Sequence, residues 1–253
     1  MFSLCPKISN NREAIEEMQS YIVDSVEIAM VDDDINTSMI NELDIKNIII
    51  HAGGEYCNIS YSNEYRKQLV RDLLKNITRN VTLLFHCGWF ENELIDSEQT
   101  INYIEGLLAV TDCNILLENT IDVSPIYAYD RAISIVNEMN NDRVALCLDT
   151  SHIRAMLNRG IDVQEYYKGI SRCKHIHFNY SSNGDGFKNM STHGVNHSKV
   201  TAVEDLKLLK TLGITSPMNI TLCPEVMEKD NDYSVRTNQI KEIELLRELE
   251  LVR

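Results

Sequence analysis

Short apolar runs alternate with longer amphipathic segments along the whole chain. The runs are rich in Ile, Val and Leu and are bounded by Gly, Asn, Asp or Pro, which is typical of strands buried on both faces. This pattern predicts strands over residues 26–30, 47–51, 81–86, 114–118, 144–149, 174–178 and 219–225, with a weaker first strand over 2–5.

The segments between these runs carry apolar residues at three- and four-residue spacing, which predicts helices over 11–23, 63–80, 97–111, 127–139, 163–171, 202–212 and 237–251. Strand and helix therefore alternate along the chain, and that order implies a parallel sheet. The length of 253 residues suits one closed barrel, and no GxGxxG motif follows the first strand to indicate a Rossmann domain. We expect an α/β fold, a single (β/α)8 TIM barrel that spans residues 1–253.

Composition narrows the setting in which the protein works. No apolar run approaches the roughly 20 residues that span a bilayer, and residues 1–6 are too few and too polar for a signal peptide, so we expect no membrane partner and no secretion. The seven cysteines are odd in number and form no CxxC pair, which favours free buried thiols in a reducing compartment: the cytoplasm, the nucleus or a viral factory. The net charge of −14 argues against broad non-specific nucleic-acid binding, although bound metal ions can dominate the charge of a cleft.

Polar residues with metal-binding chemistry fall at the C-terminal ends of six successive predicted strands, the end where β/α barrels carry their active sites. These residues are His51, His86, Glu118, Asp149, His177 and Glu225, with His152 three positions after Asp149. Each alone could be a hydrogen-bonded core or loop residue, or a carboxylate paired with an arginine. Together they place like charges at a narrow barrel mouth, where metal cations would relieve the repulsion.

Histidine and carboxylate donors without cysteine favour zinc, manganese or iron over a structural zinc knuckle. We interpret Cys147 and the other strand cysteines as packing residues. We expect His175, in phase with His177, to lie deeper in the barrel with hydrogen-bond partners, and His197 to be exposed on the long loop.

Five segments resemble the endonuclease IV family of apurinic/apyrimidinic (AP) endonucleases, which belongs to the xylose isomerase-like TIM-barrel superfamily. CLDTSH (147–152) resembles the C-(I/L)-D-T-x-H motif of that family, and ILLENT (115–120) resembles the segment with its metal-bridging glutamate. The segments IIIHAGGEYCN (48–58), LLFHCG (83–88) and HFNYS (177–181) resemble further family segments in the same order. The resemblance covers the chain from about residue 24 to residue 225.

The resemblance implies a centre of two or three zinc ions. His51 and His86 would hold one ion with Glu118, and Glu118 would bridge to a second ion held by Asp149, His177 and Glu225. His152 and His193 would hold a third ion, but Ser191 stands where the family has an aspartate, and Asp185 or His197 could take its place. The family's L-E-T-P is Leu222-Cys223-Pro224-Glu225 in this chain, and its N-terminal G-x-H-x-S is reduced to Cys5-Pro6-Lys7-Ile8-Ser9.

The resemblance also implies an activity: a hydrolase of base-excision DNA repair that cleaves the phosphodiester 5′ to an abasic site, with a zinc-activated hydroxide as nucleophile. The implied catalytic residues are Glu118, Asp149 and Glu225. The candidates for binding the abasic DNA are Tyr56, Asn58, Trp89, Lys188 and Lys199. We expect a monomer.

Two alternatives remain open at the level of the sequence. The same superfamily includes sugar isomerases and epimerases, which hold one metal with two Glu, an Asp and a His, and the charge of −14 suits a small substrate better than DNA. The other alternative is a degenerate, non-catalytic barrel, which the serine at position 191 favours.

Overall fold

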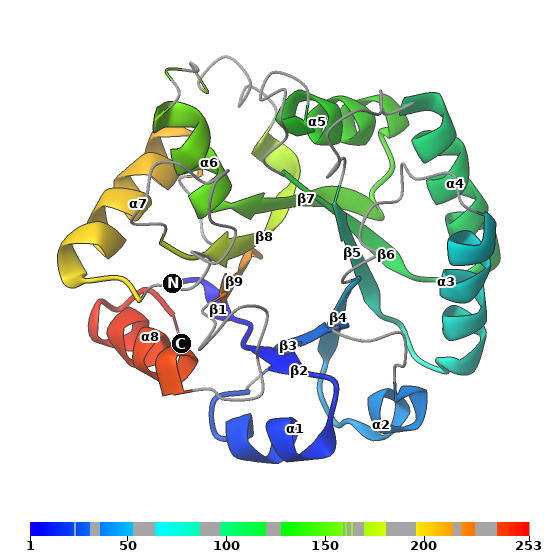
Figure 1. The fold of residues 1–253 in the computed structure, drawn as a ribbon, viewed down its shortest axis with the longest axis horizontal. Coiled ribbons are helices and arrows are strands. Elements are labelled where there is room, and N and C mark those ends of the chain that lie inside the picture. Colours follow the sequence, from blue (N-terminus) through cyan, green and yellow to red (C-terminus); the bar gives the residue numbers. More distant parts are fainter. Residues whose placement is uncertain are drawn as a thin grey trace.

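The computed structural model describes residues 1–22, 24–30, 36–52, 64–86, 97–119, 128–158, 160, 163, 170–180, 196–214, 219–225 and 237–252. Their strands form one curled, wholly parallel sheet, with the helices arranged around its outside (Figure 1). The strands are β1 (Ser3–Leu4), β2 (Lys7–Ser9), β3 (Ser25–Ala29), β4 (Asn47–His51), β5 (Thr82–His86), β6 (Asn114–Glu118), β7 (Val144–Asp149), β8 (Cys173–Phe178) and β9 (Thr221–Pro224). All seven main strands predicted from the sequence are present, within one or two residues at most ends.

The weak first strand predicted over residues 2–5 is present as β1, and the sequence pattern missed the short strand β2, which lies at the opposite edge of the sheet. The order is β1-β9-β8-β7-β6-β5-β4-β3-β2, so β1 pairs with β9 and β2 pairs with β3. Only Cys5 and Pro6 separate β1 from β2. Cys5 N–H donates to the Leu222 carbonyl at 3.0 Å, and the Pro6 carbonyl accepts from Glu27 N–H at 2.9 Å. One N-terminal segment therefore contacts both edges of the sheet.

Eight helices are described: α1 (Arg12–Met18), α2 (Thr37–Glu42), α3 (Glu64–Asn76), α4 (Ser97–Val110), α5 (Ala128–Met139), α6 (Thr150–Asn158), α7 (Lys199–Thr211) and α8 (Thr237–Glu248). The sequence pattern missed α2, which has six residues, and α6, which begins directly after β7 with no intervening loop. Most of the helix predicted over 163–171 lies outside the described residues, and its end is a 3₁₀ turn, Ile170–Arg172. Among the described residues, no helix combines the length and apolarity that crossing a membrane requires.

Successive side chains on a strand point to opposite faces of the sheet, and this alternation divides the apolar core into two parts. One large apolar cluster includes Ile48, Ile50 and the buried faces of the helices. A second, small cluster contains only inner-face side chains: Cys5, Ile49, Leu84, Leu116, Ala145, Cys147 and Cys223. Cys147 packs in this apolar cluster, and the described cysteines are all buried free thiols. Because side chains two positions apart on a strand share a face, the next inner residues toward the C-terminal ends lie directly above this apolar cluster.

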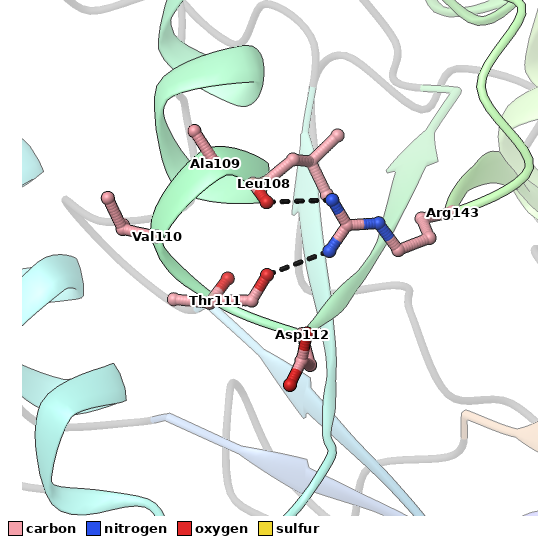
Figure 2. A pocket seen from close by; sticks show the side chains of 6 residues that line it. All are labelled: Leu108, Ala109, Val110, Thr111, Asp112 and Arg143. Carbon is pink, nitrogen blue, oxygen red and sulfur yellow. Dashed lines mark hydrogen bonds between the residues drawn. The ribbon is translucent and has the colours of Figure 1, made fainter.

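Arginines tie the loops together at the opposite, N-terminal ends of the strands. Arg143, just before β7, donates to the carbonyls of Leu108 and Thr111 at the end of α4, both at 2.7 Å (Figure 2). Arg79 and Arg172 contact loop carbonyls near β4 and β7 in the same way. These arginines donate to carbonyls that helix ends leave without partners. We infer that the residues at the N-terminal ends of the strands stabilise the fold.

Candidate metal centre

The six strand-end residues predicted as ligands do come together on the inner face of the sheet. β4, β5, β6, β7 and β8 carry His51, His86, Glu118, Asp149 and His177, respectively. Glu225 directly follows β9. All six side chains are buried, and their donor atoms form groups close enough to share an ion.

The first group is His51, His86 and Glu118. His51 Nε2 lies 3.1 Å from His86 Nε2, which lies 3.1 Å from Glu118 Oε2, and the third side, from His51 Nε2 to Glu118 Oε2, is 3.8 Å. Ligands of a tetrahedral ion with bonds of about 2.0–2.1 Å lie about 3.3 Å apart. The three donor atoms therefore already have spacings close to those that zinc coordination requires.

The second group is Glu118, Asp149, His177 and Glu225. His177 Nδ1 lies 3.0 Å from Glu225 Oε2, 3.3 Å from Glu118 Oε2 and 4.0 Å from Asp149 Oδ2. Within the described part of the chain, His177 Nδ1 and Glu118 Oε2 are buried without a hydrogen-bond partner. Buried polar atoms of this kind are costly, and a cation between them would satisfy both.

Glu118 belongs to both groups, and its Oε2 faces the nitrogens of His51, His86 and His177. Burial alone would raise the pKa of this carboxyl, but the neighbouring His177 and His86 hold it well below its ordinary value. An ionised carboxylate between two sets of donors is the arrangement of a bridging ligand. Glu118, which the family resemblance implies to be a bridging ligand, therefore has the geometry of one.

The charges of the cluster are unbalanced. Among the described residues, the cluster holds four buried carboxylates, those of Glu27, Glu118, Asp149 and Glu225, and one buried ammonium, that of Lys7, which pairs with Glu27 and Glu225. Ionised carboxylates are rarely buried without compensating charge. Divalent cations fit this deficit, and the residues present fit them as ligands.

Two members of the cluster, Glu27 and Lys7, were missed by the sequence reasoning. Lys7 Nζ lies 3.0 Å from Glu27 Oε1 and 2.7 Å from His51 Nδ1, and it also pairs with Glu225. A signal for Glu27 was available, because a carboxylate in the middle of an apolar strand needs a partner. Lys7 gave no such signal, since its short strand is weakly apolar.

Hydrogen bonds hold the outer part of the centre in place. Asp149 Oδ1 accepts from Ser151 Oγ at 2.7 Å and from His152 N–H at 2.9 Å, so its Oδ2 faces the cluster. Asn179 Nδ2 donates to Asp149 Oδ2 at 3.0 Å and to Glu225 Oε2 at 3.2 Å. These contacts fix two carboxylates relative to each other.

His152 lies beside the centre, on the first turn of α6. Its Nδ1 lies 2.6 Å from the Asn119 carbonyl and 3.7 Å from Glu118 Oε1. As a donor to that carbonyl, Nδ1 carries the proton and leaves the ring lone pair on Nε2. The other residues considered for a third ion, His193, Ser191 and Asp185, lie outside the described residues.

The remaining expectations have mixed outcomes. His175 is buried with hydrogen-bond partners, as predicted: its Nδ1 lies 2.6 Å from Thr221 Oγ1. The prediction of an exposed His197 is wrong, because Glu242 (2.6 Å from Nδ1) and Asp205 (2.8 Å from Nε2) bury and saturate both ring nitrogens. It therefore cannot replace the missing aspartate of a third site.

The candidate DNA-binding residues fall almost entirely outside the described ranges, namely Tyr56, Asn58, Trp89 and Lys188. Lys199 is described: it is exposed at the start of α7 and forms an ion pair with Glu248 of α8.

Comparison with known proteins identifies the fold but no family. No family model matches the chain, and no curated protein matches it significantly in sequence. A D-tagatose 3-epimerase-like protein matches with a TM-score of 0.68 at 16% identity, over 97% of each chain. The IolI protein with a bound zinc atom matches with a TM-score of 0.61 at 16% identity, over 99% of this chain and 97% of that one. The structure of AsfvAP:AG matches with a TM-score of 0.64 at 13% identity, over 99% and 100% of the two chains.

A xylose isomerase domain containing protein also matches, with a TM-score of 0.69 at 15% identity, and the chain shares the fold of these neighbours. Several of the matching structures are of sugar 3-epimerases. At this level of identity the likeness shows the fold alone, so the endonuclease IV resemblance is not separated from the epimerase alternative. Function has to be argued from the site.

Proposed function

We propose that this protein is a metal-dependent phosphodiesterase, an AP endonuclease that cleaves DNA 5′ to abasic sites. The observation that carries the proposal is that Glu118 is shared between two groups of donors, one with His51 and His86 and one with Asp149, His177 and Glu225. Pairs of metal ions held in this way are typical of phosphatases and nucleases. An isomerase that uses one ion has no need of the first group.

We infer as well that the curled sheet is a complete (β/α)8 barrel. When β1 and β2 are counted as one strand interrupted at Cys5 and Pro6, eight strands alternate with the helices α1 to α8. The cluster then lies at the C-terminal mouth of the barrel, where active sites of this fold lie. This arrangement supports a single catalytic domain over residues 1–253.

The chain's own residues would prepare the site for an in-line displacement. Zinc ions bound here would polarise a phosphoryl oxygen and lower the pKa of bound water. Asn179 holds Asp149 and Glu225 in a fixed relation, and Asn119 Oδ1 accepts from Asp149 N–H at 2.6 Å, which ties the ends of β6 and β7 together. Fixed ligands need little rearrangement during the reaction, which favours catalysis. Glu225 is placed both to bind metal and to accept a proton.

DNA recognition in this proposal depends on the segments that follow the strands. Tyr56, Asn58, Trp89 and Lys188 belong to such segments, and with Lys199 they remain the candidates for contacting an extruded abasic nucleotide. One neighbour of the same fold supports the metal: IolI, whose structure holds a zinc atom.

A sugar epimerase is the second candidate, and one observation favours it. Two glutamates, Glu118 and Glu225, both lie close to His177 Nδ1, and a metal-bound sugar next to two carboxylates could exchange a proton with each. Several neighbours of the same fold are sugar 3-epimerases. His51 and His86 would have no assigned role in this reaction.

The decisive test is incubation of the zinc-loaded protein with a DNA duplex that contains one tetrahydrofuran abasic site. We expect a single incision 5′ to the lesion, with a 3′-hydroxyl end, and none in the undamaged duplex. Glu118→Gln and His86→Ala should both abolish incision. No incision by protein that holds zinc, together with epimerisation of a ketohexose that survives His86→Ala, would establish the epimerase instead.

A further inference from the structure

Glu27 lies at the centre of the buried network beneath the proposed metal ligands. It is the middle residue of β3, and its side chain is fully buried. Its Oε1 lies 2.8 Å from His51 Nδ1, and its Oε2 lies 3.0 Å from His177 Nε2 and 2.7 Å from His175 Nε2. One carboxylate thus contacts a histidine of each donor group.

In both proposed ligands, Glu27 contacts the ring nitrogen opposite the one that faces the cluster. His51 turns Nδ1 to Glu27 and Nε2 toward His86, while His177 turns Nε2 to Glu27 and Nδ1 toward Glu118 and Glu225. A carboxylate accepts hydrogen bonds, so His177 carries a proton on Nε2, beside Glu27, and Nδ1 is the nitrogen that would bind a metal. His51 Nδ1 lies between Glu27 Oε1 and the Lys7 ammonium, and these two contacts fix the orientation of its ring.

Lys7 supplies the positive charge that faces Glu27, since its Nζ lies 3.0 Å from Glu27 Oε1. The same ammonium pairs with Glu225. Lys7 therefore links the carboxylate behind the ligands to a carboxylate among them.

The position of the Lys7 ammonium beside Glu27, His51 and Glu225 also explains why Glu27 is not itself a metal ligand. Glu27, His51, His177 and Glu225 have donor atoms close enough together to share an ion. Lys7 Nζ lies 3.0 Å from Glu27 Oε1 and 2.7 Å from His51 Nδ1, so the ammonium takes the place of a cation there.

We propose that Glu27 and Lys7 form a positioning pair: Glu27 fixes the orientation of one histidine ligand in each metal group and the tautomer of His177, and Lys7 serves as a built-in cation that neutralises Glu27 and holds Glu225. The inference rests on the metal centre proposed above. It gives the two donor groups a common support, so the occupancy of both depends on one carboxylate.

The test compares Glu27→Gln with Glu242→Gln, a matched control in which another fully buried glutamate paired with a histidine, His197, is neutralised away from the centre. A glutamine amide accepts hydrogen bonds through only one of its two polar atoms, so it cannot hold both His51 and His177 as Glu27 does. We expect Glu27→Gln to weaken zinc binding about 10–100-fold in a chelator competition assay. We also expect a changed electronic spectrum of the cobalt-substituted protein. Glu242→Gln should leave both unchanged.

A further variant separates positioning from folding. Lys7→Met with Glu27→Gln removes both charges, and we expect it to recover thermal stability relative to Glu27→Gln while zinc binding stays weak. Wild-type protein that binds no zinc would overturn the metal centre and this inference with it. Wild-type protein that binds zinc, with Glu27→Gln binding it equally tightly and with the same cobalt spectrum, would overturn the inference alone.

Discussion

His197 offers the sharpest test of the buried charges outside the centre. Its ring is held between Glu242 of α8 and Asp205 of α7, at 2.6 and 2.8 Å, and it stacks on Phe178 with ring centroids 4.4 Å apart. Burial opposes a charge on this histidine, but its hydrogen bonds to Asp205 and Glu242 raise its pKa above the ordinary value. His197→Ala therefore removes a cation and leaves two buried carboxylates.

The structure limits the size of the effect. Asp205 keeps its ion pair with Arg154, whereas among the described residues Glu242 keeps the Asn196 amide at 3.2 Å and the backbone N–H of residue 197 at 2.9 Å. Loss of one partner from a buried pair costs about 3–5 kcal/mol. Because one of the two carboxylates stays paired, we expect the lower end of that range, about 3 kcal/mol of unfolding free energy.

Urea unfolding of the metal-free protein, followed by circular dichroism, measures this loss. Lys199→Ala is the control, because it breaks an exposed pair with Glu248 that is worth about 0–1 kcal/mol. Adding Glu242→Leu to His197→Ala should restore part of the stability, since no unpaired glutamate remains. A loss below about 1 kcal/mol for His197→Ala, or no recovery in the double variant, would refute the claim that a buried imidazolium holds α7 and α8 together.

Three further predictions concern the pH dependence of stability, the contacts of Arg143 and the binding of zinc. Since the pKa of His197 is raised in the folded state, its stabilisation is complete below about pH 6.5 and is lost as pH rises through the folded pKa, at up to about 1.4 kcal/mol per pH unit. His197→Gln should flatten that slope in pH-dependent urea unfolding, and an unchanged slope would contradict it. Arg143→Ala should lower the unfolding free energy by about 1–3 kcal/mol without changing zinc binding, as measured by melting and titration. Zinc at 100 times its dissociation constant should stabilise the wild type by about 2.7 kcal/mol, and Glu118→Gln should reduce both this gain and the zinc bound per chain.

The strand-end residues could be predicted because two rules act together. Apolar runs mark the strands, and a parallel sheet brings their C-terminal ends to one edge, so His86 and Glu118 had to be neighbours once the order of elements was known. The same alternation explains the inner position of Cys147 and Asp149. Both rules depend on residues close together in the sequence, and the parallel sheet then brings the strand ends next to one another.

The missed features depend on contacts between distant segments. His197 was expected on the surface because nothing nearby in the sequence indicates Asp205 and Glu242 as partners from two different helices. α6 was missed because Thr150 starts the helix directly after the last residue of β7. Glu27 was not predicted as part of the site because it lies in the middle of β3 and not at a strand end. Its role depends on side chains from β2, β4 and β8.

The division of the first strand has a consequence for synthesis of the protein. β2 can pair with β3 as soon as the first few dozen residues have left the ribosome, but the partners of Ser3 and Leu4 are Thr221 and Leu222. The nascent chain must therefore carry β1 as an unpaired edge through most of translation, and such an edge can pair with the wrong strand. Pro6, which has no N–H to donate, lies where the early pairing ends and the late pairing begins.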